Sequence, residues 1–378
     1  MKTLSYGRQW INEDDIEEVV KVLRGDWLTM GPTVEAFEKS LAEYAGVKHA
    51  VTFSSGTAAL HGAMHASGMG EGDFAATTAL TFVATSNSVI YTGATPIFAD
   101  IDETFCMNPG EAERTIESHG GKVKAIIPVS FAGYPFDIEP FRKLADKYSA
   151  VLIEDASHAW GGDRASHKIG FDADMTTLSF HPVKHITTAE GGAVLTNNDK
   201  YAHKLRMFRN HGTTRNPSEF VDEAPGPWHS EMQELGYNYR LSEVHCALGL
   251  SQMRRLDEFV SRRREIAEMY LSQLSGVEGL MLPPNKPGHA WHLFIARVNE
   301  NQHGEFFAYL RDNDIRLQVH YRPVPLQPYY RKTYGYKSGD FPQAERYYAQ
   351  AVSLPIFPLM TDEDVLRVCG VIKNFAWR

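Results

Sequence analysis

The sequence predicts an α/β fold in which a mostly parallel central sheet is covered by helices on both faces. Short apolar segments typical of strands alternate with amphipathic, helix-like segments through the first half of the chain. This alternation indicates βαβ units, in which helical crossovers join parallel strands. The 378 residues, 43% of them hydrophobic, can bury a large core. We expect one large domain over residues 1–250, beginning with a helical segment, and a small C-terminal α+β domain over 251–378.

The individual elements follow from their periodicity. Residues 12–23 and 32–44 predict two amphipathic helices, the first with acidic residues early, where the helix dipole favours negative charge. Apolar runs predict the strands of the sheet at 50–53, 96–99, 125–129, 150–153, 176–180 and 193–196. Helical spacing predicts the intervening helices from Thr57 onward, at 83–91 and at 136–147.

The second half of the chain is less regular. Residues 213–235, rich in proline, glycine and charge, predict an exposed loop or lid. Residues 241–275 carry one long helical pattern, which predicts a single helix. In the small domain we expect strands at 291–298 and 317–321.

Charge and composition exclude several classes of partner. The formal net charge of -9 argues against nucleic acid, because binding a polyanion needs clustered Lys and Arg. The local basic runs 254–255 and 262–264 are predicted to be the solvated side of a helix. No apolar run approaches the roughly 20 residues of a membrane span, and the N-terminus lacks the apolar core of a signal peptide. We therefore expect no nucleic-acid or membrane partner.

The spacing of the cysteines and histidines indicates the cellular compartment and whether a metal site is expected. Three widely spaced cysteines form no Cys-x-x-Cys pair, which fits a reducing cytoplasm. The sixteen histidines form no His-Glu-x-x-His or similar ligand pattern. We expect a cytoplasmic protein without a metal site.

One lysine stands out in a polar, glycine-ended loop between two strand-like segments. This residue, Lys184, lies within residues 179–192. A lysine there can form a Schiff base if an enclosed site keeps its amine partly deprotonated. The alternative is an ordinary surface lysine.

An acidic residue follows the apolar run of residues 151–153. This buried-strand pattern runs into two acids, Glu154 and Asp155, and an unpaired carboxylate at Asp155 would be unfavourable. Together with Lys184 it suggests pyridoxal 5'-phosphate (PLP), which needs a lysine for its aldehyde and a carboxylate for its pyridinium nitrogen. The alternative is that Asp155 caps a following helix.

A third segment could hold the phosphate of that cofactor. Ser55, Gly56 and Thr57 follow a short strand and open a helix, so that backbone N–H groups and hydroxyls are available, with Ser179 from a later strand. On its own a Ser-Gly-Thr sequence marks only the start of a helix.

At these residues the chain resembles the DegT/DnrJ/EryC1/StrS sugar aminotransferases, a family with the fold type I, aspartate aminotransferase-like architecture of PLP-dependent transferases. The resemblance runs nearly end to end. It includes residues 27–32, 81–87, 208–212, 236–243 and 319–324. Within the family the chain is most similar to the transaminases that make UDP-4-amino-4,6-dideoxy-N-acetyl-β-L-altrosamine for pseudaminic acid; that similarity lies in residues 131–133, 186–192 and 319–330.

The resemblance implies a reaction and the residues that serve it. The expected enzyme transfers an amino group from L-glutamate to the 4-keto group of a UDP-linked 6-deoxy sugar, for cell-surface glycan synthesis. Lys184 would bind PLP and move the proton, Asp155 would pair with the ring nitrogen, Phe82 would stack on the ring and His158 would bind its phenolic oxygen. Asn238 would reach the phosphate held by the neighbouring subunit, which implies a homodimer with shared active sites. The substrate contacts implied are His320, Tyr321, Thr29, Met30, His181 and Glu190.

Several alternatives remain open at this point. An aminotransferase acting at C3, or on a GDP or dTDP sugar, would share every cofactor residue. Related PLP-dependent sugar dehydratases carry histidine in place of the lysine, so Lys184 argues against that class. A non-catalytic PLP-binding regulator, or an α/β binding protein without PLP, would lack turnover. For His320 a buried, satisfied histidine is the alternative to a substrate contact.

Overall fold

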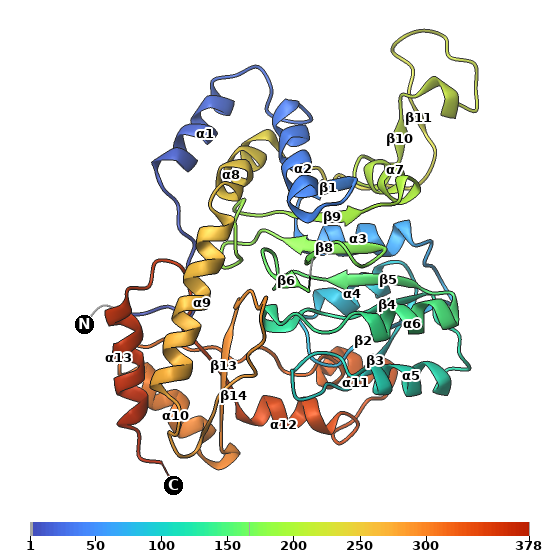
Figure 1. Cartoon of the computed structure of the whole chain (residues 1–378). Helices are drawn as coiled ribbons and strands as arrows, with labels where there is room; N and C mark the ends of the chain where they lie inside the picture. Colours follow the sequence, from blue (N-terminus) through green and yellow to red (C-terminus); the bar gives the residue numbers. More distant parts are fainter. Residues whose placement is uncertain (1–2, 166, 378) are drawn as a thin grey trace.

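A seven-stranded sheet forms the centre of the larger part of the computed structural model, which describes residues 3–165 and 167–377 (Figure 1). Within it β9 runs antiparallel to both of its neighbours, and all other neighbouring strands are parallel. The predicted mostly parallel sheet is therefore confirmed. The strands in spatial order are β1 (His49–Phe53), β9 (Gly192–Thr196), β8 (Met175–Ser179), β5 (Val151–Asp155), β4 (Ala125–Ile127), β2 (Phe74–Thr78) and β3 (Thr95–Ala99).

Helices cover both faces of this sheet. One hydrophobic core joins the sheet to α3 (Gly56–Ala66), α4 (Ala84–Tyr91) and α7 (Asp199–Phe208). A second core joins the opposite face to α5 (Pro109–Ser118) and α6 (Glu139–Tyr148). Adjacent strand residues divide between the two cores, because successive side chains of a strand point to opposite faces. Two covered faces explain why the strands are nearly continuous apolar runs.

The N-terminal helices form as predicted. In α1 (Glu13–Leu23), Asn12 caps the helix, and its side chain and that of Asp15 exchange hydrogen bonds with backbone N–H groups. In α2 (Pro32–Ala45), proline opens the helix and Gly46 ends it in the left-handed conformation. Among the strands and helices of the large sheet, β2, α5 and α7 were not predicted from the sequence.

The single helix expected over residues 241–275 is wrong. The chain forms α8 (Glu243–Met253) and α9 (Leu256–Gln273), with a break at residues 254–255. Arg255 turns back toward the N-terminal segment, where it donates hydrogen bonds to the Asp15 carboxylate at 2.7 Å and to the Trp10 carbonyl at 3.2 Å. These long-range bonds cannot be read from helical periodicity.

Two further expectations also fail. Residues 317–321 do not form a strand: their only ladder contact among described residues is a bridge between Gln318 and Ser353. The prediction that 262–264 is a solvated face is wrong for Arg263, which is 1% exposed. Hydrogen bonds to backbone carbonyls hold Arg263 inside the protein.

The C-terminal part of the chain has its own core. A three-stranded antiparallel sheet of β12 (Leu280–Met281), β13 (Phe294–Val298) and β14 (Ala351–Leu354) packs with α9, α10 (Glu300–Asp312) and α13 (Asp362–Lys373). Leu4 lies in the same core, so the N-terminal strand-like segment contributes to it. The boundary at residues 250/251 stays a prediction.

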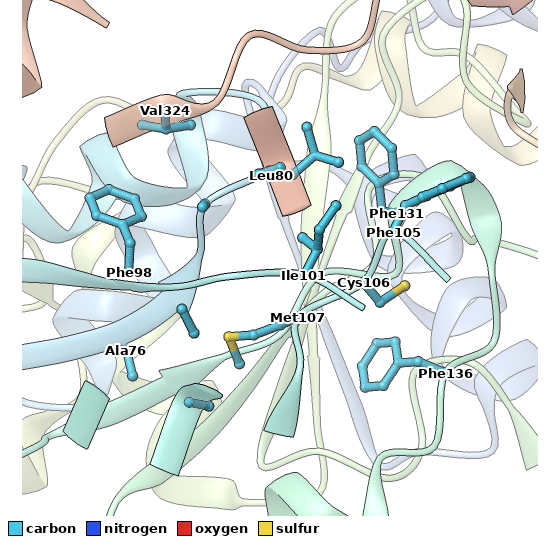
Figure 2. Close-up of a cluster of buried hydrophobic side chains, with 14 of the residues drawn as sticks. Ala76, Leu80, Phe98, Ile101, Phe105, Cys106, Met107, Phe131, Phe136 and Val324 are labelled. Atoms are coloured by element: carbon cyan, nitrogen blue, oxygen red, sulfur yellow. The ribbon is translucent and has the colours of Figure 1, made fainter. Parts of the chain in front are cut away.

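One segment of the C-terminal part is anchored in the core of the large sheet. Figure 2 shows Val324 beside Leu80 and Phe98, which belong to the large α/β core. Val324 N–H also donates to the Ala79 carbonyl at 2.8 Å. Residues just before Val324 are thereby held at the edge of the large sheet, near the site described below.

The expected exposed loop is present. Residues 213–235 contain a short hairpin of β10 (Thr213–Thr214) and β11 (Glu231–Met232), which projects from the body of the molecule (Figure 1). Val221 and Trp228 in it are 82% and 75% exposed. Across the described ranges, every helix is too short or too polar to cross a bilayer. The remaining short elements are β6 (Asp163–Arg164), β7 (His167–Lys168), α11 (Pro328–Tyr334), α12 (Pro342–Gln350) and three 3-10 turns, Phe131–Gly133, Pro217–Glu219 and Val324–Leu326.

Candidate active site

The candidate site lies where several strands of the large sheet end. Strand β5 ends at Asp155 and the parallel strand β8 ends at Ser179. The loop after β8 turns back into β9 at Gly192, opposite Ser179. In open α/β sheets, ligands bind at this carboxyl edge. The topology therefore places the Lys184 loop (residues 180–191) and Asp155 at one edge.

A cavity of about 360 Å³ opens at this edge. It brings together twelve of the residues predicted from the sequence. They are Ser55, Gly56, Thr57, Phe82, Asp155, His158, Ser179, His181, Lys184, Glu190, His320 and Tyr321. Segments far apart in the chain thus meet around one space.

The Lys184 loop is held by its own backbone and hydroxyl bonds. Lys184 N–H donates to the His181 carbonyl at 2.9 Å. The Phe180 carbonyl accepts from the Thr188 N–H and from the Thr187 hydroxyl, both at 3.0 Å. Burial lowers the pKa of Lys184 to about 8, with the Asp155 charge opposing and the Arg263 charge assisting. Lys184 as a residue is partly exposed, and it lines the cavity.

Asp155 is a buried acid that forms no close ion pair with a described cation. It is 4% exposed and forms no ion pair with any described residue. The Thr85 hydroxyl donates to one carboxylate oxygen at 2.7 Å, and Ser157 N–H donates to the other at 3.1 Å. Residues 157–161 form turns, so the alternative of a helix cap is wrong. A protonated pyridine nitrogen would supply the missing cation, which fits PLP.

The start of α3, where the sequence predicts phosphate binding, lines the cavity. The Ser55 hydroxyl caps the helix by accepting from Ala58 N–H at 3.1 Å, and the earlier N–H groups have no partner within the helix. A Cβ added at Gly56 would lie 2.8 Å from the Cβ of Ser179, and one at Gly192 would lie 2.7 Å from the Gly56 Cα. Glycine is needed at both positions because the segments approach so closely.

Aromatic and imidazole groups line the rest of the cavity. Phe82 is 53% exposed there, with its ring 5.7 Å from that of Tyr321. His158 lies deeper, 3.4 Å from the Tyr321 hydroxyl. Burial lowers the pKa of His158 well below its usual value, so the ring is neutral. His320 bonds the Ser353 hydroxyl at 2.8 Å, and burial lowers its pKa to about 4.

Three predicted site residues lie outside the cavity of their own chain. Thr29 forms a bridge with Ser242, and Asn238 forms one with Asn210. Met30 is 47% exposed and adopts φ of 54°. Asn238 is exposed, and its predicted role toward a neighbouring subunit stays a prediction. Thr29 and Met30 were expected to line the site directly.

The structure adds residues that the sequence did not indicate. Tyr6 and His292 line the cavity from distant parts of the chain, and no local pattern marks either. Thr85 is the hydrogen-bond partner of Asp155. It could have been predicted, because it lies in residues 81–87, one of the segments that resemble the family. Throughout residues 3–165 and 167–377, histidine, cysteine and acidic side chains form no group suited to a metal ion.

The lysine loop, the unpaired acid and the helix N-terminus at one sheet edge define a PLP-dependent transferase of the α/β class. Comparison with known proteins gives the family. The model of the DegT/DnrJ/EryC1/StrS aminotransferase family matches residues 9–373, and the chain belongs to that family. Enzymes of this family use PLP, so the predicted cofactor and aminotransferase class are confirmed.

Individual relatives cover almost the whole chain. The spore coat polysaccharide biosynthesis protein SpsC of Bacillus subtilis is 38% identical over 381 residues, which cover 99% of this chain and 97% of that protein. The Helicobacter pylori aminotransferase PseC, involved in pseudoaminic acid biosynthesis, has a TM-score of 0.90 at 30% identity, covering 98% of both chains. The PLP form of the putative sugar aminotransferase Spr1654 from Streptococcus pneumoniae has a TM-score of 0.90 at 28% identity, again covering 98% of each.

The residues present fit PLP in distinct roles. When bound, the cofactor supplies an aldehyde for attachment to lysine and a ring that withdraws electrons. The Lys184 Nζ would provide that attachment and, when released, hold and move a proton beside the reacting carbon. Asp155 would hold the proton of the ring nitrogen, and the start of α3 would bind the phosphate. Phe82 would cover one face of the ring and exclude water from it.

The lowered pKa of Lys184 predicts a distinctive pH dependence. Competitive acetylation of PLP-free protein, read at Lys184 by mass spectrometry, should rise about tenfold between pH 7 and pH 9 and then level off, since the amine titrates at about pH 8. A solvated lysine with pKa near 10.4 would gain roughly 100-fold over the same range without levelling. That second profile at Lys184 would contradict the enclosed amine.

Removing the charge of Asp155 should impair catalysis more than cofactor retention. Asp155→Asn keeps the side-chain size but cannot hold the pyridinium proton, so turnover should fall at least about 100-fold while PLP stays bound. Turnover and bound cofactor are measured on the same preparation. Asp199→Asn serves as control, because the Asp199 side chain is 77% exposed. Near-normal turnover in a folded Asp155→Asn protein would refute the assignment.

Proposed function

We propose that this chain transfers an amino group from L-glutamate to the 4-keto carbon of a UDP-linked 6-deoxy sugar, giving a 4-amino sugar for cell-surface glycans. The observation that carries the proposal is the cavity in which Lys184 faces the unpaired Asp155. Similarity to PseC, a pseudoaminic acid enzyme, and to SpsC, a polysaccharide biosynthesis protein, supports the sugar substrate.

The character of the cavity wall supports a sugar ring as the substrate. Lys184 is the one cationic side chain among the described residues that line it. The other polar lining groups include neutral imidazoles and the Tyr321 hydroxyl, which suit the hydroxyl and amide groups of a sugar. His181 and Glu190 are exposed on the loop and available at the cavity. The charged diphosphate and nucleotide would then lie outside this wall.

We also propose that two chains share each active site in a homodimer. Asn238, Thr29 and Met30 lie outside their own cavity, so they are available to a partner. Exposed apolar side chains surround these segments and the projecting hairpin, and such surfaces mark interaction sites. They include Trp27 at 59%, Leu28 at 53%, Trp228 at 75% and Leu235 at 72% exposed. A two-fold axis would exchange these surfaces reciprocally.

The cytoplasm is the proposed compartment. The three cysteines are buried and free, which suits reducing conditions.

Mass spectrometry of the products tests the sugar and the position. The purified enzyme is given L-glutamate and a panel of UDP, GDP and dTDP keto sugars, with the keto group at C3 or C4. The proposal predicts that the UDP-linked 4-keto-6-deoxy sugar gives the amino sugar fastest, with no product from Lys184→Ala. Preference for a C3 ketone or another nucleotide would refute the fine assignment and leave the aminotransferase class standing.

The shared site predicts complementation between inactive variants. A mixed dimer of Lys184→Ala with Asn238→Trp, a bulky change, has one site with both defects and one with neither. Mixing and exchanging the subunits should therefore restore up to about half the wild-type activity per mixed dimer, although each variant alone is inactive. Sedimentation verifies subunit exchange. No recovery after demonstrated exchange, or a fully active monomer, would refute the shared site.

A further inference from the structure

A buried arginine lies behind the Lys184 loop. Arg263 of α9 is 1% exposed, and its guanidinium donates to the backbone carbonyls of Ile356 at 2.9 Å, Trp291 at 3.2 Å and His292 at 3.3 Å. A longer bond of 3.5 Å reaches the carbonyl of Val183, the residue before Lys184. One side chain thus joins the Lys184 loop to two segments of the C-terminal part of the chain.

This arginine has no carboxylate partner, unlike its neighbours on the helix. Arg262 pairs with Glu265 and Asp362, and Arg264 pairs with Asp163. No described acid forms an ion pair with Arg263, and its buried Nε has no hydrogen-bond partner. A buried cation without an anion is unfavourable, and carbonyl dipoles offset only part of that cost. Packing alone would be better served by an apolar side chain.

Arg263 remains charged in spite of its burial. Burial lowers its pKa to about 10, which leaves the guanidinium protonated at neutral pH. The positive charge therefore persists beside the Lys184 loop whenever the enzyme works.

The other groups facing Lys184 are mostly uncharged at neutral pH. Burial lowers the pKa of the surrounding imidazoles, and it raises the pKa of the Tyr6 and Tyr321 hydroxyls. The imidazoles are those of His158, His292 and His320 on separate segments and of His181 and His185 on the loop. The acids at the cavity are Asp155 on β5 and Glu190 on the loop. Asp155 favours the protonated amine, and Arg263 opposes it.

We propose that Arg263 is a positioning residue for Lys184, which anchors the Lys184 loop to the C-terminal part of the chain and keeps a fixed positive charge behind the amine. The Arg263 charge favours the neutral, nucleophilic form of the Lys184 amine. The hydrogen bonds from Arg263 to backbone carbonyls fix the direction from which the Lys184 side chain enters the cavity. The inference rests on Lys184 as the reactive lysine and is independent of which sugar is the substrate. Failure of the substrate panel would leave it untouched.

Two variants separate the charge from the anchoring. Arg263→Met keeps the length and removes the charge; Arg263→Lys keeps the charge but has fewer donors and no planar fork. Arg262→Met is the matched control, one position away on the same helix and paired with acids. The full-length PLP-free proteins are titrated by competitive acetylation at Lys184, with folding checked by circular dichroism.

If the Arg263 charge acts on Lys184, Arg263→Met should raise the midpoint pH of Lys184 acetylation by about one unit, because a nearby cation is lost. The midpoint should stay near that of wild type in Arg263→Lys and in Arg262→Met. An unchanged midpoint in folded Arg263→Met, or an equal shift in Arg262→Met, overturns the electrostatic role.

The anchoring part is tested on the PLP-loaded proteins by hydrogen–deuterium exchange. In Arg263→Lys, peptides covering residues 181–188 should exchange several-fold faster than in wild type or Arg262→Met, while the sheet strands keep their protection. Wild-type exchange in this segment overturns the anchoring role. This measurement decides the anchoring role even if Arg263→Met does not fold.

Discussion

The parallel pairing of β5 with β8 is the constraint on which the rest of the site depends. In this register Asp155 lies opposite Thr177, and Ala156 N–H donates to the Thr177 carbonyl at 3.0 Å. Two residues beyond Thr177 the strand ends and the Lys184 loop begins. A shift by one residue would turn Asp155 toward the other face of the sheet and separate it from the lysine. The acid and the amine are close because two strands are in register.

At the same edge, backbone segments approach each other closely where the cofactor phosphate is expected to bind. β9 returns beside both β8 and β1, so Gly192 lies against the residues that lead into α3. No side chain larger than hydrogen fits at Gly56 or Gly192 without displacing backbone or the Ser179 side chain. The helix N-terminus therefore faces the cavity where Lys184 and Asp155 meet. The ends of three strands, β1, β5 and β8, thus contribute to one candidate cofactor site.

Opposing charges then set the reactivity of Lys184. Burial favours the neutral amine, Asp155 favours the protonated one, and Arg263 acts against Asp155. Burial is the largest of these effects, and Asp155 and Arg263 supply the charges that modify it. The neighbouring imidazoles are neutral at physiological pH. The pKa of the Lys184 amine therefore lies near neutral pH, at about 8. The Asp155 carboxylate stays available to the cofactor ring.

The features carried by local patterns were predictable, and those created by long-range contacts were not. Lys184 and Asp155 could be found because each follows or lies within a recognisable strand and loop pattern. His292 and Tyr6 could not, since only tertiary folding brings them to the cavity. At the break between α8 and α9, Arg255 bonds to Asp15, 240 residues away. Arg263 was assigned to the surface because charged residues are rarely buried without a partner.

We infer that PLP attaches to the side-chain amine of Lys184. Borohydride reduction of the PLP-loaded enzyme fixes that link, and peptide mapping by mass spectrometry then locates it. Attachment at Lys184 predicts one pyridoxyl-modified residue per chain, Lys184 itself, and none in Lys184→Ala. Stoichiometric modification of a different lysine would contradict it.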